Sequence, residues 1–467
     1  MINIARNQIR MGLKDAKFLF MAMLVLIAFV VNGFIYSGSY HIAREDYERS
    51  QRKTEQDLEA SSSSLLDVTN YMQTAVRPPS PLSFIADGGS AQLPNSWQVN
   101  AFMYRNPENK ARSNEQLPIV IPLDWSFIIG TLMSLLTILI SYEAVSGEKR
   151  DGTLRLLLSN PVSRMQLFLG KYLGLLSVLL ITLATCAAVS ITILITQGAL
   201  PLTADVAASI GWALLLACLC LSFFLLLSIA VSSLVVTPAI GLVILIIAWI
   251  LAVAAVPGAA RMVAEQSVKI PAIYEVTREI EARTEAMQRG MPLNSLNWDG
   301  NPFAEGMRNR TEYCRRRIAI IEEAWDKMIY EQIRQARLIN FLSYVSPTGL
   351  INSALQDICE TGISGFEKTM DLVGRYQDQL HDFTLAVDKL DAESPHLVYT
   401  WGDGTDPGVY STKPVDLSTI PRIQALWRSS GLSASQAVPW LQLILLAAAN
   451  LQMAVMAFFA LLRYDPR

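Results

Sequence analysis

Six long apolar blocks that contain no charged residue constrain this chain more than any other feature of its sequence. The blocks are Phe18–Tyr36, Trp125–Tyr142, Tyr172–Thr196, Val206–Val236, Ala239–Val256 and Trp440–Leu462. A helix needs about 20 apolar residues to cross the hydrocarbon core of a membrane. Charged residues make up 17% of the chain, whereas soluble domains contain about 25%. The sequence therefore predicts an all-α membrane protein with six transmembrane helices, called spans one to six.

Two of the blocks allow an alternative. Pro238 separates the fourth block from the fifth and predicts a tight turn between two spans, because proline interrupts a helix. The alternative is one long kinked helix, which would leave an odd number of spans and place the chain ends on opposite sides. The first block resembles a signal peptide, but it is longer than the usual apolar core of about 7–15 residues, so we expect an uncleaved anchor.

Basic residues gather in three short segments that six spans place on the same side of the membrane. These segments are residues 1–17, 143–171 and 463–467. Their basic residues are Arg6, Arg10, Lys14, Lys17, Lys149, Arg150, Arg155, Arg164, Lys171, Arg463 and Arg467. Short flanks rich in Lys and Arg stay in the cytoplasm. We therefore expect a multi-pass protein of the bacterial inner (plasma) membrane with both termini cytoplasmic.

The basic residues of the first segment are also spaced for a helix. Arg6, Arg10, Lys14 and Lys17 follow one another at intervals of four, four and three residues, which puts them on one face. Such an amphipathic helix can lie in the headgroup layer before the chain enters the membrane. The alternative is an ordinary positively charged flank.

Residues 38–123 and 257–439 remain for the outer side, and we expect two mainly helical extracytoplasmic regions there. Polar runs with few or no helix breakers are Ala43–Met72, Arg310–Tyr344 and Phe366–Leu390. In the second run, apolar residues recur at helical intervals and predict one buried stripe. The stripe consists of Ile318, Ile321, Trp325, Met328, Ile329 and Ile333.

Two of the five cysteines, Cys314 and Cys359, fall in the second outer region. An oxidising compartment permits a disulfide there, and we predict that these two residues form one. The alternative is two free thiols buried in a helical bundle.

The uncharged blocks and the missing motifs exclude several classes of protein. Proton-coupled transporters and ion pores use charges within the membrane, where each costs about 2.5–3.5 kcal/mol, and the six blocks contain none. A phosphate-binding loop requires G-x-x-x-x-G-K-[ST], and the nearest match, Gly362 to Thr369, has Glu367 at the second glycine. No Cys or His spacing predicts a metal site, and no basic aromatic segment predicts nucleic-acid binding. We therefore expect no catalytic residue, cofactor or metal in this chain, and an energy source outside it.

The most informative stretch joins spans two and three and runs from Tyr142 to Gly174 as YEAVSGEKRDGTLRLLLSNPVSRMQLFLGKYLG. Consecutive charges from Glu148 to Asp151 precede an apolar turn that Pro161 stops. Ser163 and Gln166 then have the spacing of a capping box that opens span three. A charged elbow followed by exposed leucines suits docking onto another protein. The alternative is a topogenic loop followed by a helix start.

This stretch resembles the permease subunits of type-2 ABC exporters. Their pattern is an acidic–basic cluster followed by Gly-Thr-Leu, a leucine pair, a Pro, a basic residue and Gly-Lys. The matching residues here are Glu148, Lys149, Arg150, Asp151, Gly152, Thr153, Leu154, Leu157, Leu158, Pro161, Arg164, Gly170 and Lys171. Arg155 departs from the pattern, because many members have Glu there, and this puts the ion pairs of the contact in doubt.

The layout also resembles one subgroup of these permeases, which has large extracytoplasmic insertions after spans one and five. Ser346-Pro347 and the Leu461–Asp465 ending are further points of similarity. Relatives in this subgroup include permeases of gliding-motility and nitrous-oxide-reductase maturation systems.

The resemblance implies a coupling helix that sits in a groove of a separate ATPase subunit. The residues that it assigns to this contact are Glu143, Glu148, Lys149, Arg150, Asp151, Gly152, Thr153, Leu154, Leu157, Leu158, Pro161 and Arg164. It also implies export across the plasma membrane by a homodimer or heterodimer of permeases with two ATPase chains, which bind the ATP and Mg²⁺. Membrane lipids and an extracytoplasmic protein are further expected partners.

Two rival functions share the same spans. A mechanotransmission or scaffold subunit would pass force to the outer helices and transport nothing. An ATP-independent anchor would hold envelope proteins at the membrane. Co-purification of an ATPase separates the first rival from the second, and transport in liposomes separates the exporter from the first rival.

Overall fold

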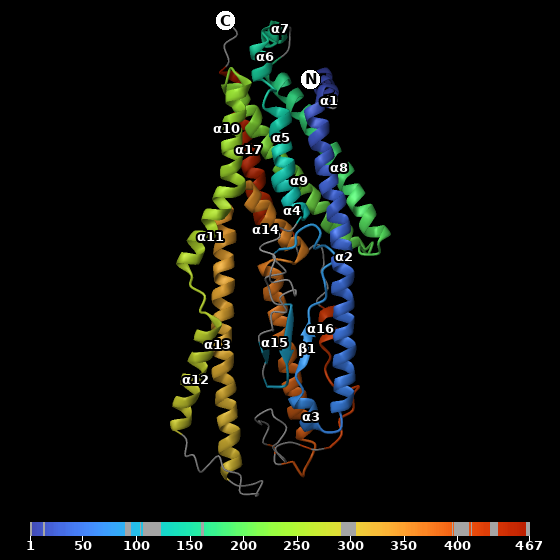
Figure 1. Cartoon of the computed structure of the whole chain (residues 1–467), viewed down its shortest axis with the longest axis vertical. Helices are drawn as coiled ribbons and strands as arrows, with labels where there is room; N and C mark the ends of the chain where they lie inside the picture. The colour runs from blue at the N-terminus through green and yellow to red at the C-terminus, as the bar shows by residue number, and fades with distance from the viewer. Residues whose placement is uncertain are drawn as a thin grey trace.

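In the part of the chain that the computed structural model describes, six helices are long and apolar enough to cross a membrane, which confirms the predicted all-α membrane fold. The structure describes residues 2–12, 15–88, 95–102, 104–105, 123–159, 163–290, 305–394, 396, 411, 413–429 and 438–463. The spans are α2 (Ala16–Ser61), Trp125–Arg150, α8 (Arg164–Thr196), α9 (Ala204–Leu234), Pro238–Ser267 and α17 (Trp440–Leu462). Both chain termini lie at one end of an elongated molecule, called here the terminal end (Figure 1).

Two predicted helix boundaries are confirmed. Helix α9 ends at Leu234, and Pro238 occupies the first turn of α10 (Pro238–Ile250), so the fourth and fifth blocks are separate spans. Ser163 and Gln166 form the capping box at the start of α8. The Gln166 N–H donates to Ser163 Oγ, and the Ser163 N–H donates to Gln166 Oε1, both at 3.2 Å. Local sequence signals therefore decide where these spans begin.

Spans two and five are irregular. Span two consists of α4 (Trp125–Phe127), the π-helical turn η1 (Ile128–Met133), α5 (Ser134–Ser141) and α6 (Ser146–Arg150). Span five consists of α10, the π-helical turn η2 (Leu251–Ala255) and α11 (Val256–Ser267). A π turn inserts one residue into a helix and is often found at functional positions.

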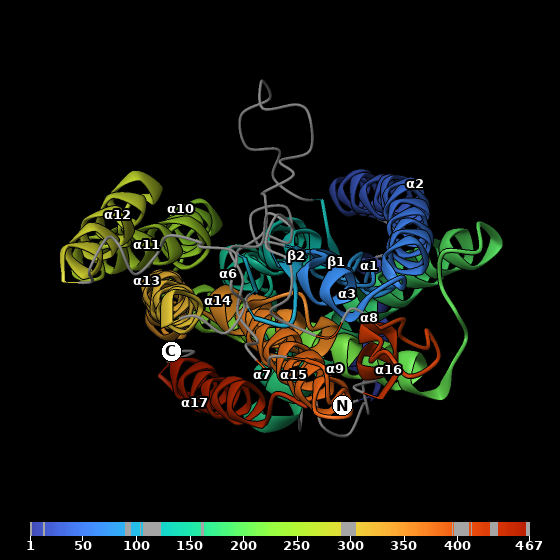
Figure 2. The same cartoon turned by 90° about the horizontal axis from the view of Figure 1, so that it is seen from below.

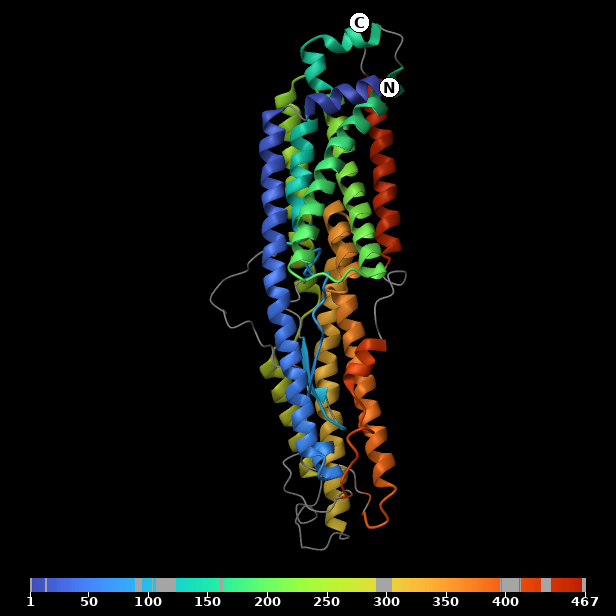
Figure 3. The ribbon, with the colours of Figure 1, turned by 90° about the vertical axis from the view of Figure 1, so that its right-hand side faces the viewer.

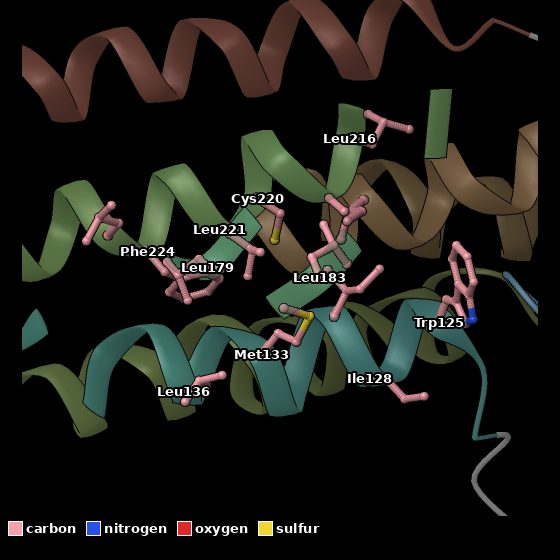
Figure 4. Packing of buried hydrophobic residues seen from close by; sticks show 14 of the residues in the cluster. Trp125, Ile128, Met133, Leu136, Leu179, Leu183, Leu216, Cys220, Leu221 and Phe224 are labelled. Atoms are coloured by element: carbon pink, nitrogen blue, oxygen red, sulfur yellow. The ribbon is translucent and has the colours of Figure 1, made fainter. Parts of the chain in front are cut away.

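The spans share one core that is centred on α9. In the most apolar window of α9, 61% of residues are buried, whereas the figure for span five is 11%. Side chains from span two, α8 and α9 interdigitate in this core (Figure 4). The labelled residues are Trp125, Ile128, Met133, Leu136, Leu179, Leu183, Leu216, Cys220, Leu221 and Phe224. Span five is therefore peripheral in this chain.

Helix α2 continues far beyond the first apolar block. Its 46 residues correspond to about 69 Å at 1.5 Å per residue. The apolar part gives way to a polar part that carries exposed ion pairs such as Arg44–Glu48 at 3.0 Å. One continuous helix therefore joins the terminal end to the part of the molecule that projects from the opposite end of the spans (Figure 3).

The projecting region contains a small sheet that the sequence analysis did not anticipate. Strands β1 (Gln73–Val76), β2 (Ser96–Val99) and β3 (Tyr104–Arg105) are antiparallel in the order β1-β2-β3, with Gln73 opposite Val99. The sheet shares a core with α3 (Leu65–Asn70), α15 (Ile363–Asp388) and α16 (Ile423–Ser429). Trp97 and Phe366 meet there with ring centroids 6.3 Å apart.

A helical hairpin of α12 (Ile273–Arg289) and α13 (Glu305–Ser343) forms the other half of the projecting region. Figures 1 and 2 place it on the opposite side of α15 from α2. The predicted apolar stripe of α13 is divided between two neighbours. Met328 and Trp325 pack with Val276 of α12, whereas Ile318, Ile329 and Ile333 join the core around α15.

Helix α14 (Pro347–Cys359) joins α13 to α15 and packs against α4, η1, α9, η2 and α17. Its buried residues are Pro347, Thr348, Gly349, Leu350, Ile351, Ser353, Ala354, Leu355, Ile358 and Cys359. The sequence analysis assigned residues 257–439 to the outer side as a whole and did not anticipate this insertion among the spans.

Candidate functional site

The stretch that carries the family resemblance lies at the terminal end and forms an elbow between spans two and three (Figures 1 and 3). We call residues 142–171 the elbow segment. It contains α6, a glycine with positive φ at Gly152, and α7 (Thr153–Ser159), and it ends in the first turns of α8. Its side chains divide into an inward set that contacts the spans and an outward set.

Ser232, near the end of α9, holds the start of α6. The Val145 and Ser146 N–H groups donate to Ser232 Oγ at 3.1 and 3.0 Å, and Ser232 Oγ donates to the Tyr142 carbonyl at 2.7 Å. The first N–H groups of a helix have no partner within the helix, and Ser232, which is fully buried, provides one. The elbow segment is therefore fixed to span four at this point.

Lys149 fixes the other end of α6 to the same span. Its Nζ donates to the carbonyls of Ser233 and Val235, the latter at 3.4 Å. The last carbonyls of a helix lack partners and carry partial negative charge, so a lysine ammonium is favoured there. Lys149 was expected at a contact with the ATPase subunit, whereas its ammonium group binds carbonyls of this chain.

Glu148 forms a buried ion pair with Lys171 of α8. The distance from Glu148 Oε1 to Lys171 Nζ is 2.7 Å, and the Lys171 side chain is 1% exposed. Lys171 Nζ also donates to the Ala144 carbonyl. Removing one partner from such a pair leaves an uncompensated buried charge. Glu148 therefore joins the elbow segment to span three rather than facing outward.

Two of the leucines that were expected to form an exposed face, Leu154 and Leu157, are not exposed. Leu154 is fully buried in the core of the spans, and Leu157 is partly buried against the same core. The prediction of an outward leucine face is therefore wrong for Leu154, whose side chain at the start of α7 packs into the core of the spans. The side chain of Leu158 and all of Pro161 lie outside the described residues.

The outward set consists of Glu143, Arg150, Asp151, Gly152, Thr153 and Arg155, all of which are exposed. Arg150 and Asp151 form an exposed ion pair at 2.9 Å. Gly152 has a φ of 71°, and a Cβ added there would contact nothing. Arg164, by contrast, faces inward and donates to the Leu462 carbonyl at the end of α17. The outward surface therefore combines charges of both signs around a left-handed turn.

Two of these contacts were missed by sequence reasoning. Lys171 was recognised as part of the motif but not as the partner of Glu148, and Ser232 was not singled out. The available signals were a lysine at the edge of an apolar block and a serine pair, Ser232-Ser233, near the end of another.

Helix α1 (Ile2–Gly12) lies beside the elbow segment and packs across α8. A Cβ at Gly174 would come within 2.8 Å of Gln8 Cβ and 2.9 Å of the Ala5 carbonyl oxygen, so the two helices need a glycine at this crossing. Arg6 and Arg10 are exposed on the opposite face. The helical spacing predicted for this segment is thus present over Ile2–Gly12.

The prediction of a disulfide is wrong, because Cys314 and Cys359 are both buried and are not bonded to each other. Cys314 lies 29 residues before the end of α13 at Ser343, about 43 Å along that helix. Cys359 ends α14 and belongs to the core of the spans. The length of α13 keeps the two sulfurs far apart.

Two other expectations concern ligand sites. Within the described residues, no group of three or more His, Cys, Asp or Glu is placed to hold a metal. In the stretch that partly matches a phosphate-binding loop, a Cβ at Gly365 would lie 1.8 Å from the Glu360 carbonyl oxygen. Helix packing therefore accounts for this glycine.

Comparison with known proteins gives a family match over nearly the whole chain. Residues 2–463 match the family described as ABC-2 family transporter protein. The chain is 54% identical over 43 residues to a probable ABC transporter permease protein NosY of Pseudomonas aeruginosa, covering 9% of this chain and 16% of the relative. It is 40% identical over 67 residues to the protein of the same description from Stutzerimonas stutzeri, covering 14% and 24%. The chain thus spans a quarter or less of these relatives in the matched segments.

Proposed function

The chain belongs to the ABC-2 family of transporter proteins, and from this premise we propose that it is the permease subunit of an ATP-driven exporter. A separate ATPase subunit binds ATP and Mg²⁺ and docks on the elbow segment. The observation that carries this proposal is the two-sided construction of that segment. Its inner side is bound to spans three and four by Glu148, Lys149 and Ser232, and its outer side presents charges.

This construction suits the transfer of force. Span two ends in α6, and α6 is bound to α8 and α9, so a push on the elbow segment moves the ends of three spans together. Interfaces and packed cores transmit displacements because they are densely packed and resist compression. The left-handed turn at Gly152 is the point where α7 can change its angle to α6.

The proposed orientation follows from the same assignment. The terminal end, with both termini and the elbow segment, faces the cytoplasm of a bacterium, and the projecting region lies outside the inner membrane. The basic residues Arg6, Arg10 and Arg150 at the terminal end agree with the positive-inside rule. Labelling of exposed residues by an impermeant thiol reagent in intact cells tests this: Glu281→Cys should react, and Thr153→Cys should react only after lysis.

We also propose that two permeases assemble with two ATPase chains, as a homodimer or a heterodimer. The low burial of span five leaves most of its surface available to lipid or to a second permease. The mass of the purified complex measures the stoichiometry.

A charge-reversal experiment tests the docking surface. The double variant Arg150→Glu/Asp151→Arg keeps an ion pair within the chain but reverses the polarity presented to a partner. We expect it to lower ATPase co-purification and ATP turnover of the complex at least about tenfold, since like charges at a contact cost several kcal/mol. Arg44→Glu/Glu48→Arg is the matched control, because it reverses an exposed pair in the projecting part of α2. Wild-type co-purification of the elbow variant would refute the proposal.

One observation favours a second function, mechanotransmission without transport. The 46 residues of α2 and the 39 residues of α13 form long helices that extend outside the apolar blocks. Such helices can pass force to an extracytoplasmic partner. ATP-dependent movement of the projecting region without transport of any cargo in proteoliposomes would support this function over export.

A further inference from the structure

Spans two and five meet next to their irregular turns, where α5 contacts α10. Ser134 follows η1 directly, and Trp249 lies two residues before the start of η2. Trp249 Nε1 donates to Ser134 Oγ at 2.8 Å. A π turn displaces the regular hydrogen-bond ladder and leaves a carbonyl available to a partner outside the helix. The two turns therefore form a paired site at which both spans can bend.

Helix α14 uses the carbonyl that η2 makes available. Thr348 Oγ1 donates to the Ala252 carbonyl at 3.0 Å, and Ser346 Oγ donates to the same oxygen. Ser346 also caps α14 by accepting the Thr348 N–H at 3.2 Å. The start of α14 is thus attached to the bend of span five, at a position where both hydroxyl groups are buried.

Spans two and six hold α14 as well. Ser126 Oγ of α4 donates to Asn352 Oδ1 at 2.8 Å. A Cβ at Gly130 of η1 would be 3.8 Å from Thr348 Cγ2, so the π turn of span two also borders α14. Gln442 Nε2 of α17 donates to Asp357 Oδ2 at 2.9 Å. Helix α14 therefore contacts both bends and a third span.

The turns that connect α14 to the projecting helices are tightly packed. A Cβ at Gly349 would lie 2.1 Å from the Ser343 carbonyl oxygen at the end of α13. The turn into α15 is equally close at Gly365, and it contains Glu360 in the left-handed region with φ 53°. A displacement of α14 must therefore move the ends of α13 and α15.

We propose that α14 is the element that carries bending of spans two and five to the projecting helices, through the attachment of Ser346 and Thr348 to the Ala252 carbonyl. This inference rests on the proposed function, because it takes ATP-driven motion of the elbow segment as its input. It goes beyond that function by assigning a route: elbow segment, span two, η1 and η2, α14, and then α13 and α15.

The test measures ATP-dependent distances between spin labels in the full-length permease with its ATPase, in a cysteine-free background in nanodiscs. The outer pair is at Glu281 of α12 and Gln379 of α15, and the inner pair is at Thr153 of α7 and Ala239 of α10, all of which are exposed. ATP with vanadate provides the trapped state. Thr348→Val removes one hydroxyl at constant shape and keeps the Ser346 cap, and Ser346→Ala/Thr348→Val removes both attachments.

In the wild type, both pairs should change distance on trapping. In Thr348→Val the distance change at the outer pair should fall by about half, and in the double variant it should vanish, since the two hydroxyl groups share the attachment to the Ala252 carbonyl. The distance change at the inner label pair and the ATP turnover should persist in both variants. Thr384→Val is the matched control, because it loses a buried hydroxyl bond within α15, and it should behave as the wild type.

The outcomes separate this inference from the proposed function. If the distance change at the outer label pair persists in the double variant, α14 does not carry the bending to the projecting helices, and the exporter proposal remains intact. If the wild type shows a distance change at the inner label pair but none at the outer pair, the role of α14 is also overturned and the exporter proposal again stands. No change at either pair in the wild type would overturn both proposals.

Discussion

The two ends of this molecule are held together by different kinds of contact. At the terminal end, the elbow segment is bound to the spans by a buried ion pair and by polar groups placed on helix ends. In the projecting region, the helices carry exposed ion pairs such as Arg283–Glu323, which bridges α12 and α13 with its side chains 36% and 68% exposed. Buried charges are costly to separate, whereas exposed pairs contribute little. The terminal end should therefore be sensitive to single substitutions that the hairpin of α12 and α13 tolerates.

The largest effect is expected from separating Glu148 and Lys171. Glu148→Ala should destabilise the permease by about 3–5 kcal/mol, because Lys171 is then buried without its counter-ion. Thermal unfolding in detergent, followed by tryptophan fluorescence, measures the loss. The double variant Glu148→Leu/Lys171→Met should recover most of the stability, and a midpoint for Glu148→Ala equal to the wild type would show that the pair is not structural.

This expectation revises the role that the motif suggested for Glu148. Loss of ATPase binding in a Glu148 variant would follow from a displaced elbow segment, whereas loss in an Arg150 and Asp151 variant would follow from the contact itself. The recovered double variant separates the two causes, because it restores the fold without restoring the carboxylate.

A smaller effect is expected at Ser232. Ser232→Ala leaves the Val145 and Ser146 N–H groups without their acceptor, at a cost of about 1–3 kcal/mol for each buried group that stays unpaired. The same unfolding measurement applies. Ser177→Ala is the control, because the Ser177 hydroxyl donates to the Leu173 carbonyl of its own helix. Equal midpoints for the two variants would contradict the role of Ser232 as a cap.

Gly152→Ala should cost about 1–2 kcal/mol, because a side chain is disfavoured at positive φ even where space is available. Its φ is 71° and a Cβ would meet no atom, so strain of the backbone is the expected cause. Gly211→Ala is the control, since that glycine lies in α9 with open space around it and alanine favours a helix. A stabilised Gly152→Ala would mean that the turn at residue 152 is not left-handed.

The smallest effect is expected in the projecting region. Arg283→Ala removes the ion pair with Glu323 and should change stability by about 0.2–1 kcal/mol, and less at high salt. Arg289→Ala, which removes the pair of Arg289 with Glu285 at 3.6 Å, should change it no more. If Arg283→Ala lowers the stability as much as Glu148→Ala does, the two ends do not differ in the way proposed here.

Features that depend on short stretches of sequence were predictable. The number of spans, the break at Pro238 and the capping box at Ser163 all follow from local hydropathy, proline geometry and side-chain spacing. The helical character of α2, α13 and α15 follows from the same kind of signal. Each of these depends on residues within a few turns of one another, so the chain contains the information locally.

The direction of the side chains in the elbow segment was not predictable in this way. The spacing of Glu148, Lys149 and Leu154 identified the motif, but their partners are Lys171, the end of α9 and the core of the spans. Those partners are distant in the sequence or belong to the core that the packed spans form together. Consecutive charges in a polar loop suggest an outward surface equally well, and only helix packing distinguishes the two arrangements.

By itself the sequence determined the class of fold, the six spans, and the motif that relates this chain to transporter permeases, because hydropathy and helix capping act along the chain. The tertiary structure alone decided that α14 enters among the spans, that Cys314 and Cys359 stay apart, and that a small sheet packs on α15. The physical reason is that burial of a short helix, the distance between two thiols and the pairing of strands depend on contacts between segments that only the folded chain brings together.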